Sequence, residues 1–301
     1  MKNLLSTISL FACMLFCVVS CKKENTERHY GKYPILFSSS YETKATANVS
    51  DIQKNGFKVF AFYQANGNDL NFEKNVTYKS DQNIYDYEGI EYWISGATYW
   101  FKAVYPKELT YTIDNSTKDQ RLTISNFDIT SQQDILVATA GNIEVDPNIQ
   151  APTTGNVVEL QFQHLLANVT IKIKAQVDNV IIRKITIDDA ETLYTYNGSQ
   201  WTGSNKTSIS IEPARALIKG ADYVDVTQGG ILVIPASSNK PLTIEASNKT
   251  YNVKIPSGTW EQGVKYSYTL EIKQDDISFV DGAPYVETWD SENATGSVII
   301  K

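Results

Sequence analysis

The sequence contains very few of the residues that build disulfides and metal sites. Among its 301 residues there are three cysteines and two histidines. The cysteines are Cys13, Cys17 and Cys21. Residues 22–301 therefore cannot form an internal disulfide, and the stability of that part must come from buried apolar surface. Because His164 has no thiol and only one distant histidine to share a metal ion with, the sequence predicts no metal site and no cofactor.

The sequence also lacks the patterns of nucleic-acid binding and of common enzymes. Its formal net charge is −7, and its lysines alternate with acidic residues instead of forming a basic patch, so nucleic acid is not an expected partner. No Gly-x-Ser-x-Gly, glycine-rich phosphate loop or His-Glu-x-x-His pattern occurs. Paired carboxylates such as Asp188 and Asp189 are typical of any acidic surface. We therefore expect no enzymatic activity. A glycosidase is the enzymatic alternative, because its two carboxylates can come from distant strands.

The chain begins with a long apolar run. Lys2 precedes apolar residues from Leu4 to Val19, a run too short to span a membrane comfortably and typical of secretion signals. The Val-Val-Ser sequence before Cys21 resembles the lipobox of bacterial lipoproteins, in which the cysteine is acylated after the signal is removed. This resemblance implies a signal peptide over residues 1–20 and lipidation at Cys21. An ordinary signal peptide with incidental cysteines is the alternative.

The segment that follows the apolar run is polar and predicts a tether over residues 21–33. Its sequence, KKENTERHYGKY after Cys21, offers nothing to a hydrophobic core and favours a flexible chain. Several acyl chains on one cysteine would exceed the limit of weak, reversible membrane binding. We therefore expect stable attachment to a membrane through Cys21.

Beyond the tether the sequence has the composition and spacing of β-structure. It is rich in threonine, isoleucine, valine and tyrosine, with 18 tyrosines in all, and these residues favour pleated, half-buried surfaces. Long amphipathic helical patterns are scarce. Roughly fourteen to sixteen short strands are expected, with turns about every 8 to 12 residues. A chain of this length is expected to form two β-sandwich domains in tandem, so the predicted fold class is all-β.

A long loop marks the expected domain boundary. Residues 141–156 contain two prolines and end near Gly155, which favours irregular backbone over a strand. The prediction is an N-terminal β-sandwich domain over residues 34–157 and a C-terminal β-sandwich domain over residues 158–301.

The alternation of apolar residues changes just after this boundary. Val158 and Phe162 belong to an apolar series at every second position, and the series from Val169 to Ala175 has the opposite parity. A strand cannot change parity without a bulge or a turn, so two strands are predicted on either side of an irregular element at residues 164–167. The histidine in this element is interpreted as a packing or hydrogen-bonding side chain.

Several short motifs occur in an order that resembles a known family. They are YWFKAVYP, DILVATA, VELQFQHLLANVTIKI, ILVIPA and WEQGVKYSYTLEI. With the lipobox, this order resembles the fimbrillins of Bacteroidetes, which are subunits and accessory proteins of type V pili. The resemblance covers most of the chain after the signal. It implies two transthyretin-like β-sandwich domains, export as a lipoprotein to the cell outer membrane, surface exposure, and incorporation into a pilus after processing.

The resemblance also implies an assembly mechanism. In the family, a trypsin-like protease cuts the loop after the first strand, that strand leaves, and a strand of a neighbouring subunit fills the groove. Here the displaced strand corresponds to Ile35, Leu36 and Phe37, and the cut corresponds to the bond between Lys44 and Ala45. The loop has no arginine, although pilin maturation often uses one. The alternative is a member that stays uncut and acts as an anchor or accessory protein.

The donor strand corresponds to Val298, Ile299 and Ile300 near the C-terminus, whose apolar side chains suit a hydrophobic groove. The alternative is that this tail is the last strand of its own domain. The implied partners are other fimbrillin subunits, the outer membrane through Cys21, and adhesion ligands on host or bacterial surfaces. The expected function is that of a pilus subunit or accessory protein that supports adhesion. The alternative is a monomeric surface lipoprotein that binds glycans.

Overall fold

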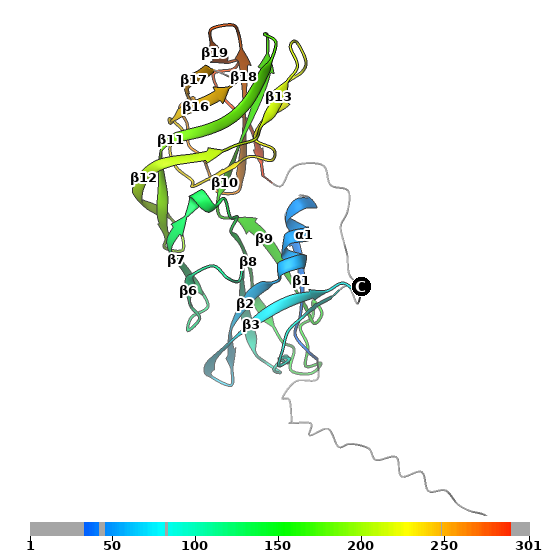
Figure 1. The fold of residues 1–301 in the computed structure, drawn as a ribbon. Helices are drawn as coiled ribbons and strands as arrows, with labels where there is room; N and C mark the ends of the chain where they lie inside the picture. Colours follow the sequence, from blue (N-terminus) through cyan, green and yellow to red (C-terminus); the bar gives the residue numbers. More distant parts are fainter. Residues whose placement is uncertain (1–32, 42–45, 82–83, 248, 290–301) are drawn as a thin grey trace, which may run out of the picture.

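A computed structural model describes residues 33–41, 46–81, 84–247 and 249–289 (Figure 1). Over these ranges the chain forms twenty β-strands, one α-helix and one 3-10 helix. The all-β prediction is confirmed, and the strands gather in two lobes that meet near the middle of the molecule. No helix in these ranges is long and apolar enough to cross a membrane.

The first lobe is built on a seven-stranded sheet in the order β1-β9-β8-β5-β2-β3-β4. Neighbouring strands are antiparallel, except that β1 and β9 run parallel. The sheet curls until its two edge strands lie in contact, and Ser39 Oγ on β1 is 2.6 Å from Tyr85 Oη on β4. It therefore wraps around its own core. Its strands are β1 (Leu36–Tyr41), β2 (Phe57–Ala65), β3 (Asn68–Lys79), β4 (Ile84–Asp86), β5 (Thr98–Tyr105), β8 (Leu136–Glu144) and β9 (Val157–His164).

Strand β2 of this sheet is buried on both faces over most of its length. In β2, Phe57 and Val59 belong to the core inside the curl, whereas Phe60 belongs to the core of the second lobe. Tyr99 and Phe101 of β5 join Phe57 inside the curl. A strand with two buried faces is a continuous apolar run instead of an alternating one, which is the pattern that the sequence of β2 has.

One helix, α1 (Thr46–Asn55), lies between β1 and β2 in the chain. Its residues are mostly polar, and among its residues 51–55 Ile52 is fully buried and belongs to the first core. The helix ends at Gly56, whose φ is +71° and whose N–H donates to the Ile52 carbonyl at 2.7 Å. A Cβ on Gly56 would lie 2.1 Å from the Val76 carbonyl oxygen, so only glycine fits there.

The second lobe packs two sheets against each other. One has the order β14-β10-β18-β19, with β15 beside β10 and β20 beside β18. The other has the order β17-β16-β11-β7-β6, with β12 and β13 beside β11. Their facing sides form one large apolar core. The strands are β6 (Tyr111–Asp114), β7 (Arg121–Asp128), β10 (Ala167–Ala175), β11 (Val180–Tyr196), β12 (Trp201–Ile211), β13 (Arg215–Leu217), β14 (Val224–Asp225), β15 (Ile231–Val233), β16 (Pro241–Ala246), β17 (Lys249–Lys254), β18 (Val264–Ile272), β19 (Ile277–Phe279) and β20 (Tyr285–Thr288).

The strand pairing differs from the expected division at residue 157. Strand β9 was assigned by sequence to the C-terminal domain, yet it pairs with β8 and β1 in the first sheet. In the other direction, β6 and β7 lie in a sheet of the second lobe, where Tyr194 of β11 is paired with Phe127. Strand β9 stays with the first sheet because the proline-containing loop before it is held on the first lobe. There the N–H of Val145 donates to the Ala97 carbonyl at 2.9 Å. The chain therefore crosses between the lobes more than once.

The predicted irregular element separates β9 from β10. Leu165 and Leu166 are both buried there, so the parity changes where the chain passes into the second lobe. The imidazole of His164 is fully buried, its Nδ1 lies 2.7 Å from an Asp134 carboxylate oxygen, and its ring stacks on Trp289 with centroids 3.7 Å apart. The interpretation of this histidine as a packing side chain is confirmed. The short helix η1 (Ile129–Ser131) lies just before Asp134 in the chain.

Candidate functional site at strand β1

Strand β1 is the edge strand of the first sheet and pairs with one strand, β9. The parallel register joins Leu36 to Val157 and continues to Tyr41 and Phe162. Parallel pairing is slightly less stable per residue than antiparallel pairing. In Figure 1, β1 lies beside α1 in the lower lobe, at the blue end of the described chain.

The side chains of this segment alternate between the core and the surface. Ile35, just before β1, is fully buried, and Phe37 is 4% exposed. Leu36 and Ser38 point to the opposite face and are half-buried. Burial of a side chain as large as isoleucine or phenylalanine contributes roughly 1.5 to 3 kcal/mol. Ile35 and Phe37 therefore dominate the docking of β1.

Aromatic rings surround Phe37. Its centroid lies 5.5 Å from that of Tyr87 and 5.8 Å from that of Phe101, the latter with edge-to-face geometry. Beneath β1, Phe162 of β9 is fully buried, and its ring is 5.2 Å from that of Phe57. Without β1, these rings would line an apolar groove beside an unpaired edge of β9, which is the kind of surface that accepts another strand.

Polar groups fix the backbone where the chain enters β1. The N–H of Ile35 donates to the Glu91 carbonyl at 2.9 Å, and the N–H of Leu36 donates to the Asn156 carbonyl at 3.0 Å. The indole N–H of the fully buried Trp93 donates to the same Asn156 carbonyl at 3.3 Å. The segment before β1 therefore lies between the 91–93 segment and the loop that precedes β9.

The Tyr87 hydroxyl bonds both to the segment before β1 and to the 91–93 segment. Its hydroxyl donates to the Ile35 carbonyl at 2.8 Å and accepts from the N–H of Glu91 at 3.2 Å. Burial raises the pKa of Tyr87 to about 12, so the hydroxyl is a protonated donor at neutral pH. Tyr85 bonds Ser39 farther along β1, and burial raises the pKa of this tyrosine as well.

Replacing Tyr87 with phenylalanine is expected to lower the free energy of unfolding by about 1 to 3 kcal/mol, because two buried backbone groups lose their partner. Chemical denaturation measures the change. Tyr285→Phe is the control, since the side chain of Tyr285 is 68% exposed. Equal stability of Tyr87→Phe and Tyr285→Phe would contradict the role of the Tyr87 hydroxyl.

The effect of Tyr87→Phe on stability is also expected to depend on pH. The pKa of Tyr87 is about 12 in the folded protein and about 10 in an unfolded chain. A raised pKa means that the folded state holds this proton more tightly. The contribution of the raised Tyr87 pKa to the free energy of unfolding is complete below about pH 10 and decreases as the pH rises towards 12. The Tyr87→Phe variant should therefore lose less stability over this interval than the unmodified protein.

The structure brings some of the predicted site residues together and leaves the others undescribed. Ile35 lies just before the edge strand β1, and Leu36 and Phe37 are its first two residues. Cys21, Lys44, Ala45, Val298, Ile299 and Ile300 lie outside the described residues. In sequence, Lys44 and Ala45 belong to the four-residue segment between the end of β1 at Tyr41 and the start of α1 at Thr46. Within the described part of the chain, no group of histidine, cysteine and acidic residues could hold a metal ion.

The model of the fimbrillin-like family matches residues 43–289 of the sequence. The chain belongs to the fimbrillin-like family. The match spans both lobes and includes every described element except β1.

Solved structures share the fold of this fimbrillin-like protein. A fimbrial protein from Bacteroides vulgatus is 15% identical, with a TM-score of 0.61 over 85% of this chain and 99% of its own. A candidate cell adhesion protein from Bacteroides ovatus is 15% identical, with a TM-score of 0.58 over 87% and 99%. Another, from Bacteroides uniformis, is 18% identical, with a TM-score of 0.55 over 85% and 97%. At these identities the likeness concerns the fold. No curated protein matches the chain.

Sequence reasoning missed the residues that hold strand β1 in place. Tyr85, Tyr87 and Trp93 all lie in an aromatic-rich stretch with Gly89 and Gly96, which reads as a loop between strands. A signal was present, because loops rarely contain so many aromatic residues unless these are buried. Their partners lie in β1 and β9, far away in sequence, so the pattern alone could not assign them.

Proposed function

We propose that this protein is a non-enzymatic subunit or accessory protein of a cell-surface fimbrium and that it assembles by strand exchange at the position of β1. The supporting observation is the placement of β1. It is an edge strand whose apolar side chains complete the core of the first lobe. A strand in this position can be exchanged without breaking any pairing inside the sheet.

The proposed trigger is cleavage between Lys44 and Ala45. Lys44 comes three positions after the end of β1, so a cut there would leave Ile35 and Phe37 attached to the tether alone. After the cut, β1 would be retained only by its contacts with β9 and the surrounding aromatic rings. Its departure would open the groove lined by Tyr87, Phe101 and Phe162.

The proposed donor is the C-terminal tail of a neighbouring subunit. Val298, Ile299 and Ile300 offer three successive apolar side chains of the kind that Ile35 and Phe37 present in β1. A strand with this composition would replace both the backbone pairing to β9 and part of the lost burial. The tail would leave its own subunit after β20, an edge strand that pairs with β18.

The proposed route to the surface is lipoprotein export. Cys21 would carry the acyl chains, residues 21–33 would form the tether, and the protein would be anchored in the cell outer membrane. Cleavage at Lys44 would then release the fimbrillin from its lipid, because the anchor lies on the N-terminal side of the cut. An uncut copy would remain on the membrane as an anchor or accessory protein.

Limited proteolysis of the protein beginning at Lys22 tests this function. We expect a trace of trypsin to cut after Lys44, residues 22–44 to dissociate, and the remaining chain to form a ladder of multimers in native mass spectrometry. The Lys44→Gln variant is the control. It should lose only pieces of the tether and remain a monomer. A variant without residues 296–301 should be cut but should not multimerise.

Three results would overturn the proposal in different ways. A chain that is not cut after Lys44 would make an anchor or accessory role the better function. A chain that is cut and stays monomeric would contradict strand exchange and favour a monomeric surface lipoprotein that binds glycans. Multimers formed without residues 296–301 would exclude the tail as the donor.

A further inference from the structure

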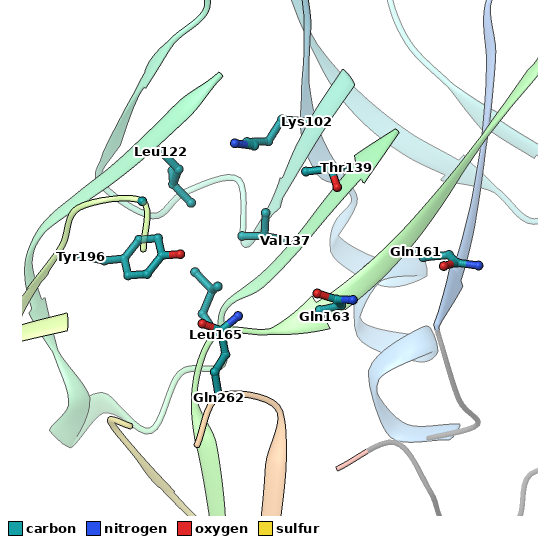
Figure 2. Close-up of a pocket in the computed structure, with 10 residues that line it drawn as sticks. Lys102, Leu122, Val137, Thr139, Gln161, Gln163, Leu165, Tyr196 and Gln262 are labelled. Carbon is teal, nitrogen blue, oxygen red and sulfur yellow. The ribbon is translucent and has the colours of Figure 1, made fainter. Parts of the chain in front are cut away.

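A polar cleft of about 430 Å³ lies where the outer face of the first sheet meets the second lobe (Figure 2). Thr139 of β8 and the pair Gln161 and Gln163 of β9 form one side of it. These three positions alternate with residues that point into the first core, so the pleat of the sheet turns them outward. The opposite side comes from Tyr196 and Gln262 of the second lobe.

The chemistry of the lining is that of an uncharged, hydrogen-bonding surface. Three glutamine amides each offer both donors and acceptors, and Thr139 and Tyr196 add hydroxyls. No carboxylate lines the cleft, so it does not suit a cation. Among the apolar residues of the lining, Leu122 and Leu165 are buried, and the half-buried Val137 supplies an apolar contact between the polar groups. The volume lies within the range of roughly 300 to 1,000 Å³ that is typical of small-ligand sites.

The cation in the lining, Lys102, is hydrogen-bonded to backbone carbonyls. Lys102 Nζ donates to the carbonyls of Asp119 and Gln120, which occupies two of its three N–H donors. Burial lowers the pKa of Lys102, and the nearby Asp119 carboxylate opposes that change. One donor is left for an acceptor in the cleft, and the ligand needs no negative charge.

Tyr196 contributes its hydroxyl to the cleft and keeps its ring in the core. Its ring is buried against Trp201, with centroids 5.0 Å apart, and its hydroxyl points towards the cleft (Figure 2). Burial raises the pKa of Tyr196, so at neutral pH the hydroxyl is a donor. Gln163 and Gln262 lie across from this hydroxyl in the same view.

An extended peptide does not suit this cleft. Peptides that bind to sheets usually add a strand to an unpaired edge. Here β8 is paired with β5 and β9, and β9 is paired with β8 and β1, so neither offers a free edge on the cleft. The binding groups available are side chains that project from the face of the sheet.

We propose that this cleft binds a short, uncharged oligosaccharide. Sugar hydroxyls both donate and accept hydrogen bonds, as the exposed glutamine amides of the lining do, and the half-buried Val137 can contact the C–H groups of a sugar. This inference goes beyond the proposed function by giving the subunit a ligand, and it rests on that function for display of the protein at the cell surface. It does not depend on cleavage or strand exchange, since the lining contains no residue of β1.

Saturation-transfer NMR and calorimetry on the protein beginning at Lys22 test the proposal. The probes are lactose, N-acetyllactosamine, maltotriose and mannotriose, with 3′-sialyllactose as the charged comparison. At least one uncharged probe is expected to bind saturably. Gln163→Ala and Gln262→Ala should each weaken that binding about tenfold, which corresponds to the loss of about one hydrogen bond. Gln274→Ala, on an exposed loop of the second lobe away from the lining, should leave it unchanged.

The outcomes separate this inference from the proposed function. No binding by any uncharged probe would overturn it, as would binding of 3′-sialyllactose alone. Full binding by both Gln163→Ala and Gln262→Ala would show that the sugar sits elsewhere. Because the readout is ligand binding by the uncut monomer, failure of these tests leaves the multimer ladder after trypsin unaffected. Failure of the ladder leaves sugar binding unaffected.

Discussion

Replacement of Phe37 by alanine is expected to lower the free energy of unfolding by about 3 to 5 kcal/mol, the loss typical of buried phenylalanines. Phe37 is 4% exposed and fills the space between Tyr87 and Phe101. Alanine would leave a cavity there. The neighbouring rings would fill it only in part, because their other contacts hold them in place. Urea denaturation followed by tryptophan fluorescence measures the loss, because the buried Trp93 lies in the same core.

The matched control for this prediction is Leu36→Ala on the other face of the same strand. Leu36 is half-buried and lies outside the core inside the curl, so its truncation should cost about 1 kcal/mol. Hydrogen exchange should also show faster opening of β1 in Phe37→Ala than in Leu36→Ala. Equal losses in the two variants would mean that the backbone pairing with β9, and not the apolar anchor, retains the strand.

Replacement of Gly230 by alanine is expected to destabilise the second lobe by more than 3 kcal/mol, as changes that combine strain with overpacking do. Gly230 has a φ of +108°, and a Cβ there would lie 1.9 Å from Asn168 Oδ1. Asn168 is 3% exposed, and its amide N–H donates to the Gly229 carbonyl at 2.9 Å. The asparagine therefore cannot move aside without losing this bond.

The adjacent glycine provides the control. Gly229 has nearly the same φ, +111°, but a Cβ on it would meet no atom within 4 Å. Gly229→Ala should therefore show only the backbone strain, about 1 to 2 kcal/mol. Thermal or urea unfolding of the two variants isolates the steric part. Losses that agree within error would contradict the tight contact with Asn168.

Much of the fold could be predicted because alternation records which faces of a strand are buried. The parity change between Phe162 and Val169 located the junction of β9 and β10, where the structure has buried leucines between the two strands. Alternation does not show which lobe packs on the buried face of a strand. The pairing of Phe127 with Tyr194 could not be read from either segment, so the exchange of β6, β7 and β9 between the lobes was missed.

Some residues of the candidate sites could likewise be named from the sequence, and others could not. Ile35 and Phe37 were singled out through the family resemblance, and the structure places them just before and within the edge strand β1. The Tyr87 hydroxyl and the cleft could not be predicted. Tyr87 acts on Ile35 across the curl of the sheet, and the cleft combines exposed polar residues from both lobes. Exposed glutamines carry no periodic signal, and only the fold shows that Gln163 and Gln262 share one cavity.

The exchange of strands between the lobes has a mechanical consequence. The chain passes from one lobe to the other between β5 and β6, again between η1 and β8, and a third time between β9 and β10. A pull applied to opposite ends of the molecule would thus be shared by three connections in parallel. The lobes would resist stretching and twisting as one stiff body, whereas two domains joined by a single linker would swing apart under a small force.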